Sequence, residues 1–343
     1  MPSNTLEDVL DEVSEIYTAS GGDLATRLYR EIMLNALKFR RSDLDTLDLK
    51  IISRAMAEIR YAARVFKPYR NIRKASIFGS ARTPEQDPYY EMAVKFSKEL
   101  VAHEFMVITG AAHGIMKAGI VGAGADKSFG VNILLPFEQG ANEVITDDPK
   151  LITFRYFFTR KLFFLMEAHA VALFPGGFGT HDEGFETLTL LQSGKAPPMP
   201  LVLMELPHQD YWESWDGFVR EQMLKRGFIA VEDLSLYKIV HSAEDGVEWI
   251  RHFYSTYHSS RQVGDDLVIR LERDLTDEQI DELNERFADL LSSGRIRRTV
   301  PLPAEQDEPD LLAKPRIAFA YNKKSAGRRT EMILHINKLG AAE

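Results

Sequence analysis

The sequence has 343 residues, of which 45% are hydrophobic and 27% charged, and it contains no cysteine. These values are typical of a globular protein with about two domains, and they exclude collagen, coiled coils and wholesale disorder. The lack of cysteine excludes thiol nucleophiles, disulfides and Cys-ligated metals, and the net charge of −9 disfavours nucleic acid and anionic membranes as partners.

The N-terminal segment, residues 1–66, is predicted to be a helical extension. Asn4 and Glu7 fit a capping box, and apolar residues recur after them at three- and four-residue spacing. The segment begins with acidic rather than basic residues, and no apolar run in the chain approaches the roughly 20 residues of a membrane span. We therefore expect a cytoplasmic protein.

Residues 67–260 are predicted to form a doubly wound α/β domain. Short apolar runs indicate buried strands at 75–79, 106–110, 131–135, 170–174 and 201–204. Helical segments near 87–103, 113–126, 157–168, 180–193 and 211–226 separate or follow them. This alternation predicts a mostly parallel, Rossmann-like sheet with helices on both faces, and such sheets bind ligands beyond the carboxyl ends of their strands.

Residues 261–343 are predicted to form a small α+β region. Strands are expected at 267–271 and 317–321, and a last helix at 328–339. A capping box from Thr276 to Gln279 predicts a helix that runs to Gly294. Nothing in this region indicates what it binds.

A glycine-rich loop, residues 175–183, follows one predicted strand and opens a predicted helix. Gly176, Gly177 and Gly179 let the backbone approach a ligand closely, and the helix N-terminus offers free N–H groups, so the loop is a candidate phosphate cradle. It lacks the third glycine of the dinucleotide fingerprint and the Gly-Lys-Ser/Thr of a Walker loop. A kinase or a dehydrogenase is therefore disfavoured.

Glu183 and the pair Arg160-Lys161, the charged residues near this loop, each have two interpretations. Glu183 either completes a capping box with Thr180 or acts as a functional carboxylate. Arg160 and Lys161 lie in an otherwise apolar helix, where they either extend to solvent or pair with an anion. Spacing alone does not choose between these interpretations.

The loop, Pro-Gly-Gly-Phe-Gly-Thr-His-Asp-Glu, resembles the PGGxGTxxE motif of the LONELY GUY (LOG) family, often mislabelled as lysine decarboxylases. Arg160-Lys161 resembles the Arg-Lys pair of that family. Gly79-Ser80 after the first strand, and Gly110, Gly114 and Met116 after the second, resemble its other two glycine loops. The resemblance covers about residues 75–260, and the helical and α+β extensions fall outside it.

The resemblance implies a phosphoribohydrolase. Such an enzyme hydrolyses the N-glycosidic bond of a purine nucleoside 5′-monophosphate, such as AMP or a cytokinin riboside monophosphate, to the free base and ribose 5-phosphate. Arg160 and Glu183 would be catalytic. The expected substrate-binding residues are Gly79, Ser80, Gly110, Gly114, Met116, Lys161, Gly176, Gly177, Gly179 and Thr180.

The same resemblance implies a homodimer or a higher homo-oligomer, and the mechanism requires no cofactor. We expect no metal site, because the histidines show no metal-ligand spacing. The general acid that protonates the leaving base stays open, with Asp182 and His181 as candidates. The alternative function is a non-catalytic carrier or sensor that binds a nucleotide or another phosphorylated ligand in the same cradle. An interaction protein whose extensions matter more than its pocket is a third hypothesis.

Overall fold

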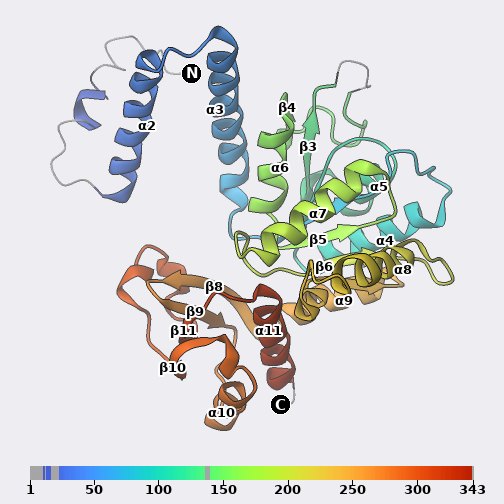
Figure 1. The fold of residues 1–343 in the computed structure, drawn as a ribbon. Coiled ribbons are helices and arrows are strands. Elements are labelled where there is room, and N and C mark those ends of the chain that lie inside the picture. The colour runs from blue at the N-terminus through green and yellow to red at the C-terminus, as the bar shows by residue number, and fades with distance from the viewer. Residues whose placement is uncertain (1–10, 12, 17–22, 136–139, 342–343) are drawn as a thin grey trace. The chain divides into compact units, whose positions relative to one another are not determined.

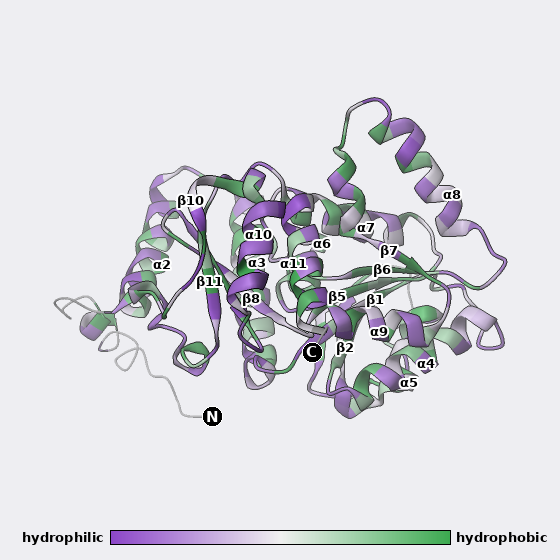
Figure 2. Cartoon of the chain, turned by 90° about the horizontal axis from the view of Figure 1, so that it is seen from below, coloured by the Kyte–Doolittle hydropathy of each residue, from purple (hydrophilic) through white to green (hydrophobic). Residues whose placement is uncertain are grey.

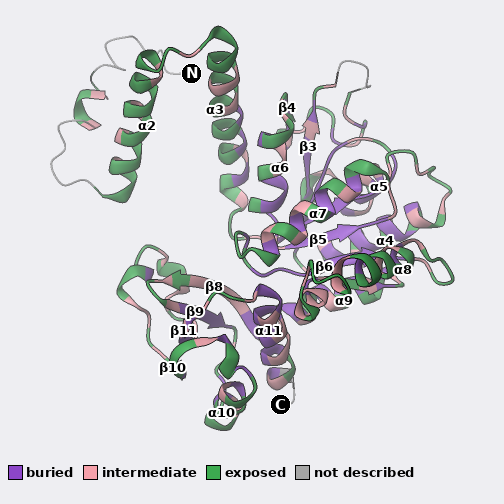
Figure 3. Ribbon diagram, in the orientation of Figure 1, coloured by how far each residue is buried: buried purple, intermediate pink, exposed green. Residues whose placement is uncertain are grey.

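The computed structural model describes residues 11, 13–16, 23–135 and 140–341, and it divides into two compact units, Met1–Tyr61 and Ala62–Glu343 (Figure 1). In the first unit, α2 (Leu24–Arg41) is capped by Asp23, whose carboxylate accepts the Thr26 N–H. No residue of α2 is buried (Figure 3). The helix α3 (Thr46–Phe66) begins in this unit. The predicted capping box of Asn4 and Glu7 lies outside the described residues.

The second unit contains a seven-stranded sheet in the order β4-β3-β2-β1-β5-β6-β7, and every neighbouring pair is parallel. The strands are β1 (Lys74–Phe78), β2 (Met106–Thr109), β3 (Ser128–Ile133), β4 (Leu151–Phe154), β5 (Ala170–Leu173), β6 (Leu201–Met204) and β7 (Lys238–Val240). This confirms the predicted α/β fold. The sequence did not predict β4 and β7, which are the two edge strands.

Helices cover both faces of the sheet: α4 (Pro88–Ala102), α5 (Ile115–Ala123), α6 (Phe157–Met166), α7 (Phe178–Gln192), α8 (Tyr211–Phe218) and α9 (Ala243–Phe253). Alternate strand residues enter separate apolar clusters: Ile77 joins the cluster that includes α4 and α9, whereas Phe78 joins that of α6. The strands of the parallel sheet are largely hydrophobic in Figure 2. Among the described residues, no helix combines the length and the apolar character needed to cross a bilayer.

The chain reverses its direction of travel across the sheet between β1 and β5. Strands β2, β3 and β4 lie on one side of β1, whereas β5, β6 and β7 lie on the other. In open parallel sheets, the loops after two such strands diverge and leave a crevice where ligands bind. The loop after β1 begins at Gly79, and the loop after β5 contains the glycine motif.

Helix α7 begins earlier than the sequence predicted. Its N-cap is Gly177, so Thr180 is already the third residue of the helix. The capping box of Thr180 with Glu183, one of the two interpretations of Glu183, is therefore wrong, because the glycine loop leads directly into the helix. Helix α8 is also shorter than expected, since it continues from Val219 to Leu224 as a π-helical segment.

The C-terminal part contains an antiparallel sheet in the order β10-β11-β9-β8. Its elements are β8 (Tyr257–Val263), β9 (Asp266–Leu271), α10 (Asp277–Arg286), β10 (Leu291–Arg298), β11 (Arg316–Tyr321) and α11 (Ala326–Ala341). The capping box of Thr276 with Gln279 is confirmed. The prediction of a helix to Gly294 is wrong: α10 ends at Arg286, and Gly294 (φ 69°) lies within β10, where the pairing with β11 is irregular.

The antiparallel sheet and α11 share one apolar cluster with the face of the parallel sheet that α4 and α9 cover. The buried side chain of Asn337, on α11, joins the two parts. Its amide donates to the carbonyl of Phe253 (2.7 Å), and its oxygen accepts the N–H groups of Thr256 and Tyr257 (3.0 and 2.8 Å). The predicted division at residues 66 and 260 stays a prediction.

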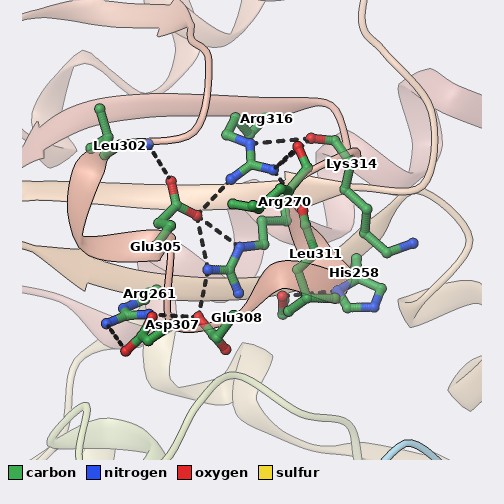
Figure 4. A network of polar contacts seen from close by, with 12 residues as sticks. His258, Arg261, Arg270, Leu302, Glu305, Asp307, Glu308, Leu311, Lys314 and Arg316 are labelled. Atoms are coloured by element: carbon green, nitrogen blue, oxygen red, sulfur yellow. Dashed lines mark hydrogen bonds and ion pairs between the residues drawn. The ribbon is translucent and has the colours of Figure 1, made fainter. Parts of the chain in front are cut away.

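The acidic, Pro-rich segment 301–315 is held to this sheet by a buried ionic cluster (Figure 4). Glu305 is fully buried, and its Oε1 accepts bonds from Arg270 Nε (2.9 Å) and Arg316 Nη1 (2.7 Å). Its Oε2 accepts the Leu302 N–H (2.9 Å). Arg270 also pairs with Glu308 (2.7 Å). Two buried cations are thus balanced by two carboxylates.

Candidate active site

The loops after β1, β2 and β5 meet at Ser80. Its N–H donates to the Pro175 carbonyl (3.1 Å), and its own carbonyl accepts the Ile115 N–H (3.1 Å) at the start of α5. These bonds bring the three predicted glycine loops together at the carboxyl end of β1, beside the reversal point of the sheet.

Three of the predicted substrate-binding glycines are explained by the packing of these loops. A Cβ atom on Gly79 would lie 2.7 Å from Ile115, and one on Gly110 would lie 2.6 Å from the sulfur of Met116. Gly114 has a φ of 61°, and its Cβ would lie 2.2 Å from the carbonyl oxygen of Ser80. Larger residues would push the loops apart, and direct contact of these positions with a substrate stays a prediction.

The glycine motif combines one tight position with two open ones. A Cβ on Gly176 would lie 2.1 Å from Oγ1 of Thr180, whose residue is 5% exposed. In contrast, a Cβ on Gly177 or Gly179 would have no described atom within 4 Å. The first N–H groups of a helix have no partner within the helix, so the start of α7 presents donors beside open space.

Glu183 is buried on the first half of α7, with 3% of its surface exposed. Its Oε1 lies 4.0 Å from Nη2 of Arg160, and its Oε2 has no hydrogen-bond partner among the described residues. Burial raises the pKa of Glu183 to about 7, against the opposing influence of the Lys161 and Arg160 cations. A carboxylate of this kind changes its protonation state near neutral pH.

Arg160 reaches Glu183 from the neighbouring helix α6. Its guanidinium packs over the rings of Phe157 (4.9 Å) and Phe164 (5.4 Å), and 15% of its side chain is exposed. The two rings fix the direction of the guanidinium, as cation–π contacts do. Arg160 is therefore held beside the carboxylate and does not extend into solvent.

Lys161 bridges α6 and α7. Its Nζ lies 2.8 Å from Oδ2 of Asp182 and 2.7 Å from Oε2 of Glu186. These carboxylates raise the pKa of Lys161, although burial opposes them. The ammonium group thus has two protein partners, and its predicted contact with a substrate stays a prediction. Asp182, a candidate general acid, forms an ion pair with Lys161.

Sequence reasoning missed Tyr211, the first residue of α8. Its hydroxyl donates to the Gly176 carbonyl and lies 2.7 Å from Nε2 of His181. Because the tyrosine proton goes to Gly176, Nε2 of His181 is the donor in this pair. Burial lowers the pKa of His181, which favours the neutral ring. No motif signals Tyr211, since it lies about 30 residues after the loop it holds.

Two other residues beside the loops were also missed. The Asn142 side chain is 1% exposed and donates to the carbonyls of Ala111 (2.9 Å) and Ala112 (3.2 Å), in the loop after β2. Phe178 occupies the variable position of the glycine motif and is 96% exposed. An aromatic residue at that position gives no sequence signal, because the motif accepts any residue there.

Helix α6 also presents an apolar face to the surface. Phe157, Phe158, Leu162 and Met166 are each between 44 and 56% exposed, whereas Phe163 and Phe164 are buried against the sheet. An exposed apolar stripe is a common feature of subunit contacts. The expected homo-oligomer stays a prediction.

Residues 108–250 match the model of the family described as "Possible lysine decarboxylase". The X-ray structure of TM1055 is 17% identical, covering 52% of this chain and 99% of its own, with a TM-score of 0.37. The molybdenum cofactor carrier protein from Chlamydomonas reinhardtii is 17% identical (53% and 97% covered, TM-score 0.37). DNA processing protein A from Helicobacter pylori is 12% identical (52% and 79% covered, TM-score 0.36). No curated protein matches the sequence.

Proposed function

We propose that this protein is a nucleoside 5′-monophosphate phosphoribohydrolase, because residues 108–250 match a model of the LOG family, which includes phosphoribohydrolases. It would split a purine nucleotide such as AMP, or a cytokinin riboside monophosphate, into the free base and ribose 5-phosphate. The observation that carries the proposal is the buried Glu183 carboxylate, set beside Arg160 and one and a half turns into the helix that begins at the glycine loop.

The 5′-phosphate would bind at the start of α7. The first-turn N–H groups and the positive end of the helix dipole favour a dianion there, and the open space at Gly177 and Gly179 leaves room for it. Thr180 supports the turn through its contact with Gly176. Arg160 supplies a fixed positive charge on the adjacent helix.

The ribose would then lie near Glu183. The bond between the anomeric carbon and the base nitrogen breaks, and its electron pair leaves with the base. The sugar develops the positive charge of an oxocarbenium ion, which a carboxylate stabilises more than it stabilises the neutral ground state. Water adds to the anomeric carbon, and one water proton ends on the base. Glu183 would stabilise the cation and accept a hydrogen bond from the attacking water through its unpartnered Oε2.

A panel of compounds tests this function. We expect purified protein to release free base from AMP and related purine nucleoside monophosphates, but to release it from the corresponding nucleosides far more slowly, because these lack the phosphate. Lysine should yield no cadaverine. Chromatography of the products measures all three. Nucleotide binding without base release would instead favour the carrier or sensor function, and equal rates for nucleosides would contradict the phosphate cradle.

The pH dependence tests the state of Glu183. Since burial raises its pKa to about 7, the catalytic carboxylate forms as the pH rises through 7. We expect kcat/KM for AMP to increase about tenfold per pH unit below pH 7 and to level off above it. The substrate phosphate titrates nearer pH 6. A profile that is flat between pH 6 and 8 would show that ionised Glu183 is not required.

A further inference from the structure

A second pocket, of about 340 Å³, lies at the other end of α7 from the glycine loop. One wall comes from the end of α7 and the turn after it, including Gln192, Ser193 and Lys195. The other wall comes from the C-terminal sheet, the loop after β11 and α11, including Lys323 and Arg329. The volume falls within the range of small-molecule sites.

The side chains that line this pocket give it a positive charge. Lys195 and Lys323 are exposed, and neither forms an ion pair with a described residue. The first turn of α11 also contributes, since Ala326 at its start lines the pocket and helix N-termini carry a partial positive charge. No aspartate or glutamate is among the described residues that line it.

Arg329 is the strongest evidence that this pocket binds an anion. It is 93% buried, being only 7% exposed, yet within the described part of the chain its guanidinium has no carboxylate partner and its Nε has no hydrogen-bond partner. The guanidinium lies 5.8 Å from the centre of the Tyr321 ring. A buried charge is normally paired, because removing it from water is costly. The adjacent Arg328 is partly exposed and nevertheless pairs with Asp289 (3.0 Å) and Glu331 (2.7 Å).

We propose that this pocket is a second anion site, which binds the phosphate group of a phosphorylated small molecule. Three cations line it, together with Ser193 and the start of α11, and Arg329 has no carboxylate partner among the described residues. A phosphate dianion matches this charge, and the remaining volume admits a sugar-sized group.

Binding to this site is separable from binding to the glycine loop. Binding is measured by isothermal titration of the full chain with inorganic phosphate, ribose 5-phosphate and AMP. Ribose serves as the uncharged control. The AMP titrations use the E183Q protein, so that AMP is not consumed. We expect the K195E/K323E protein, which changes only exposed side chains, to bind the phosphates at this site at least tenfold more weakly. T180V, which alters the glycine loop, should keep this site.

Two variants of adjacent arginines complete the test. R329Q removes an unpaired buried charge, so we expect a higher melting temperature without ligand. On adding phosphate, its melting temperature should rise less than that of wild type, because only the glycine loop then remains to bind phosphate. R328Q, the matched control, should melt at a lower temperature and still respond to phosphate. Tighter binding of ribose 5-phosphate or AMP than of inorganic phosphate would identify an organic phosphate as the ligand, and equal binding would identify the free ion. Wild-type phosphate affinity in both K195E/K323E and R329Q would overturn the proposal, whether or not the protein hydrolyses nucleotides.

Discussion

Replacing Glu183 with glutamine is expected to slow base release from AMP by about 10²- to 10⁴-fold while leaving the protein folded. Glutamine has the size of glutamate but no negative charge, so it cannot stabilise the positive charge that develops on the ribose. A mere helix cap would contribute about 1 kcal/mol and leave turnover intact, and Glu183 is not at the cap position. Single-turnover release of base, with circular dichroism to monitor folding, measures the effect.

Glu186 on the same helix gives the matched control. E186Q removes one of the two carboxylate partners of Lys161 but leaves Asp182 in place, so its turnover should stay within about threefold of wild type. Near-normal base release from E183Q would sink the catalytic assignment, and so would an equal loss in E186Q.

The thermal stability of E183Q tests the raised pKa of Glu183 independently of its activity. The raised pKa means that folded Glu183 holds its proton more tightly than the unfolded chain does, so ionising it weakens the fold as the pH rises from 4.5 to about 7. The difference corresponds to about 3 kcal/mol at higher pH. E183Q should therefore melt at a higher temperature than wild type at pH 8, and the two should differ little at pH 4.

Replacing Glu305 with glutamine is expected to lower the free energy of unfolding by about 3 kcal/mol or more, because Arg270 and Arg316 would lose the carboxylate they share. Urea denaturation measures the change. The control D307N removes an exposed partner of Arg261 and should change the stability by less than about 1 kcal/mol. Replacing Glu305, Arg270 and Arg316 together with Met should recover much of the loss, because no unpaired charge then remains.

Acid sensitivity distinguishes this cluster from ordinary packing. Burial alone would raise the pKa of Glu305, but the Leu302 N–H and the two guanidinium groups hold it below the usual 4.5. The stabilisation is therefore complete above pH 4.5 and is lost as the pH falls through the lower, folded-state pKa. The difference in stability between wild type and E305Q should shrink in that acidic range. A constant difference would show that the charge on Glu305 is unimportant.

The sequence predicted the central strands well and the edges poorly. The runs that became β1, β2 and β5 are buried on both faces, so most residues in them are apolar. Edge strand β4 is only half buried, and β7 has three residues. In the C-terminal sheet, β10 is mostly polar and exposed, so it gives little strand signal. Its Gly294 was predicted to end a helix, because glycine is common there, but its positive φ occurs within an irregular strand.

The candidate site divides in the same way. The motif placed Glu183 and Arg160 on two helices, and the fold brings their side chains within 4.0 Å. Their burial, and with it the pKa of Glu183, could not be predicted because it depends on how α6 packs against α7. Tyr211 was missed because its contact with Gly176 joins residues 35 positions apart. Lys195 and Lys323 could not be paired from the sequence, since only the fold brings them to the same pocket.

Helix α7 connects the glycine loop with the short helix that precedes β7. Its first turn starts at the glycine loop, and its last residue, Gln192, donates to Asp233 (2.7 Å) in the short helix Val231–Leu236. The same short helix contacts α11, because its Ser235 hydroxyl donates to the carbonyl of Gly327 on α11 (2.9 Å). Fifteen residues make a rod of about 22 Å. The glycine loop and α11 are therefore connected through α7 and this short helix, with Glu183 in the first half of α7 and Gln192 at its end.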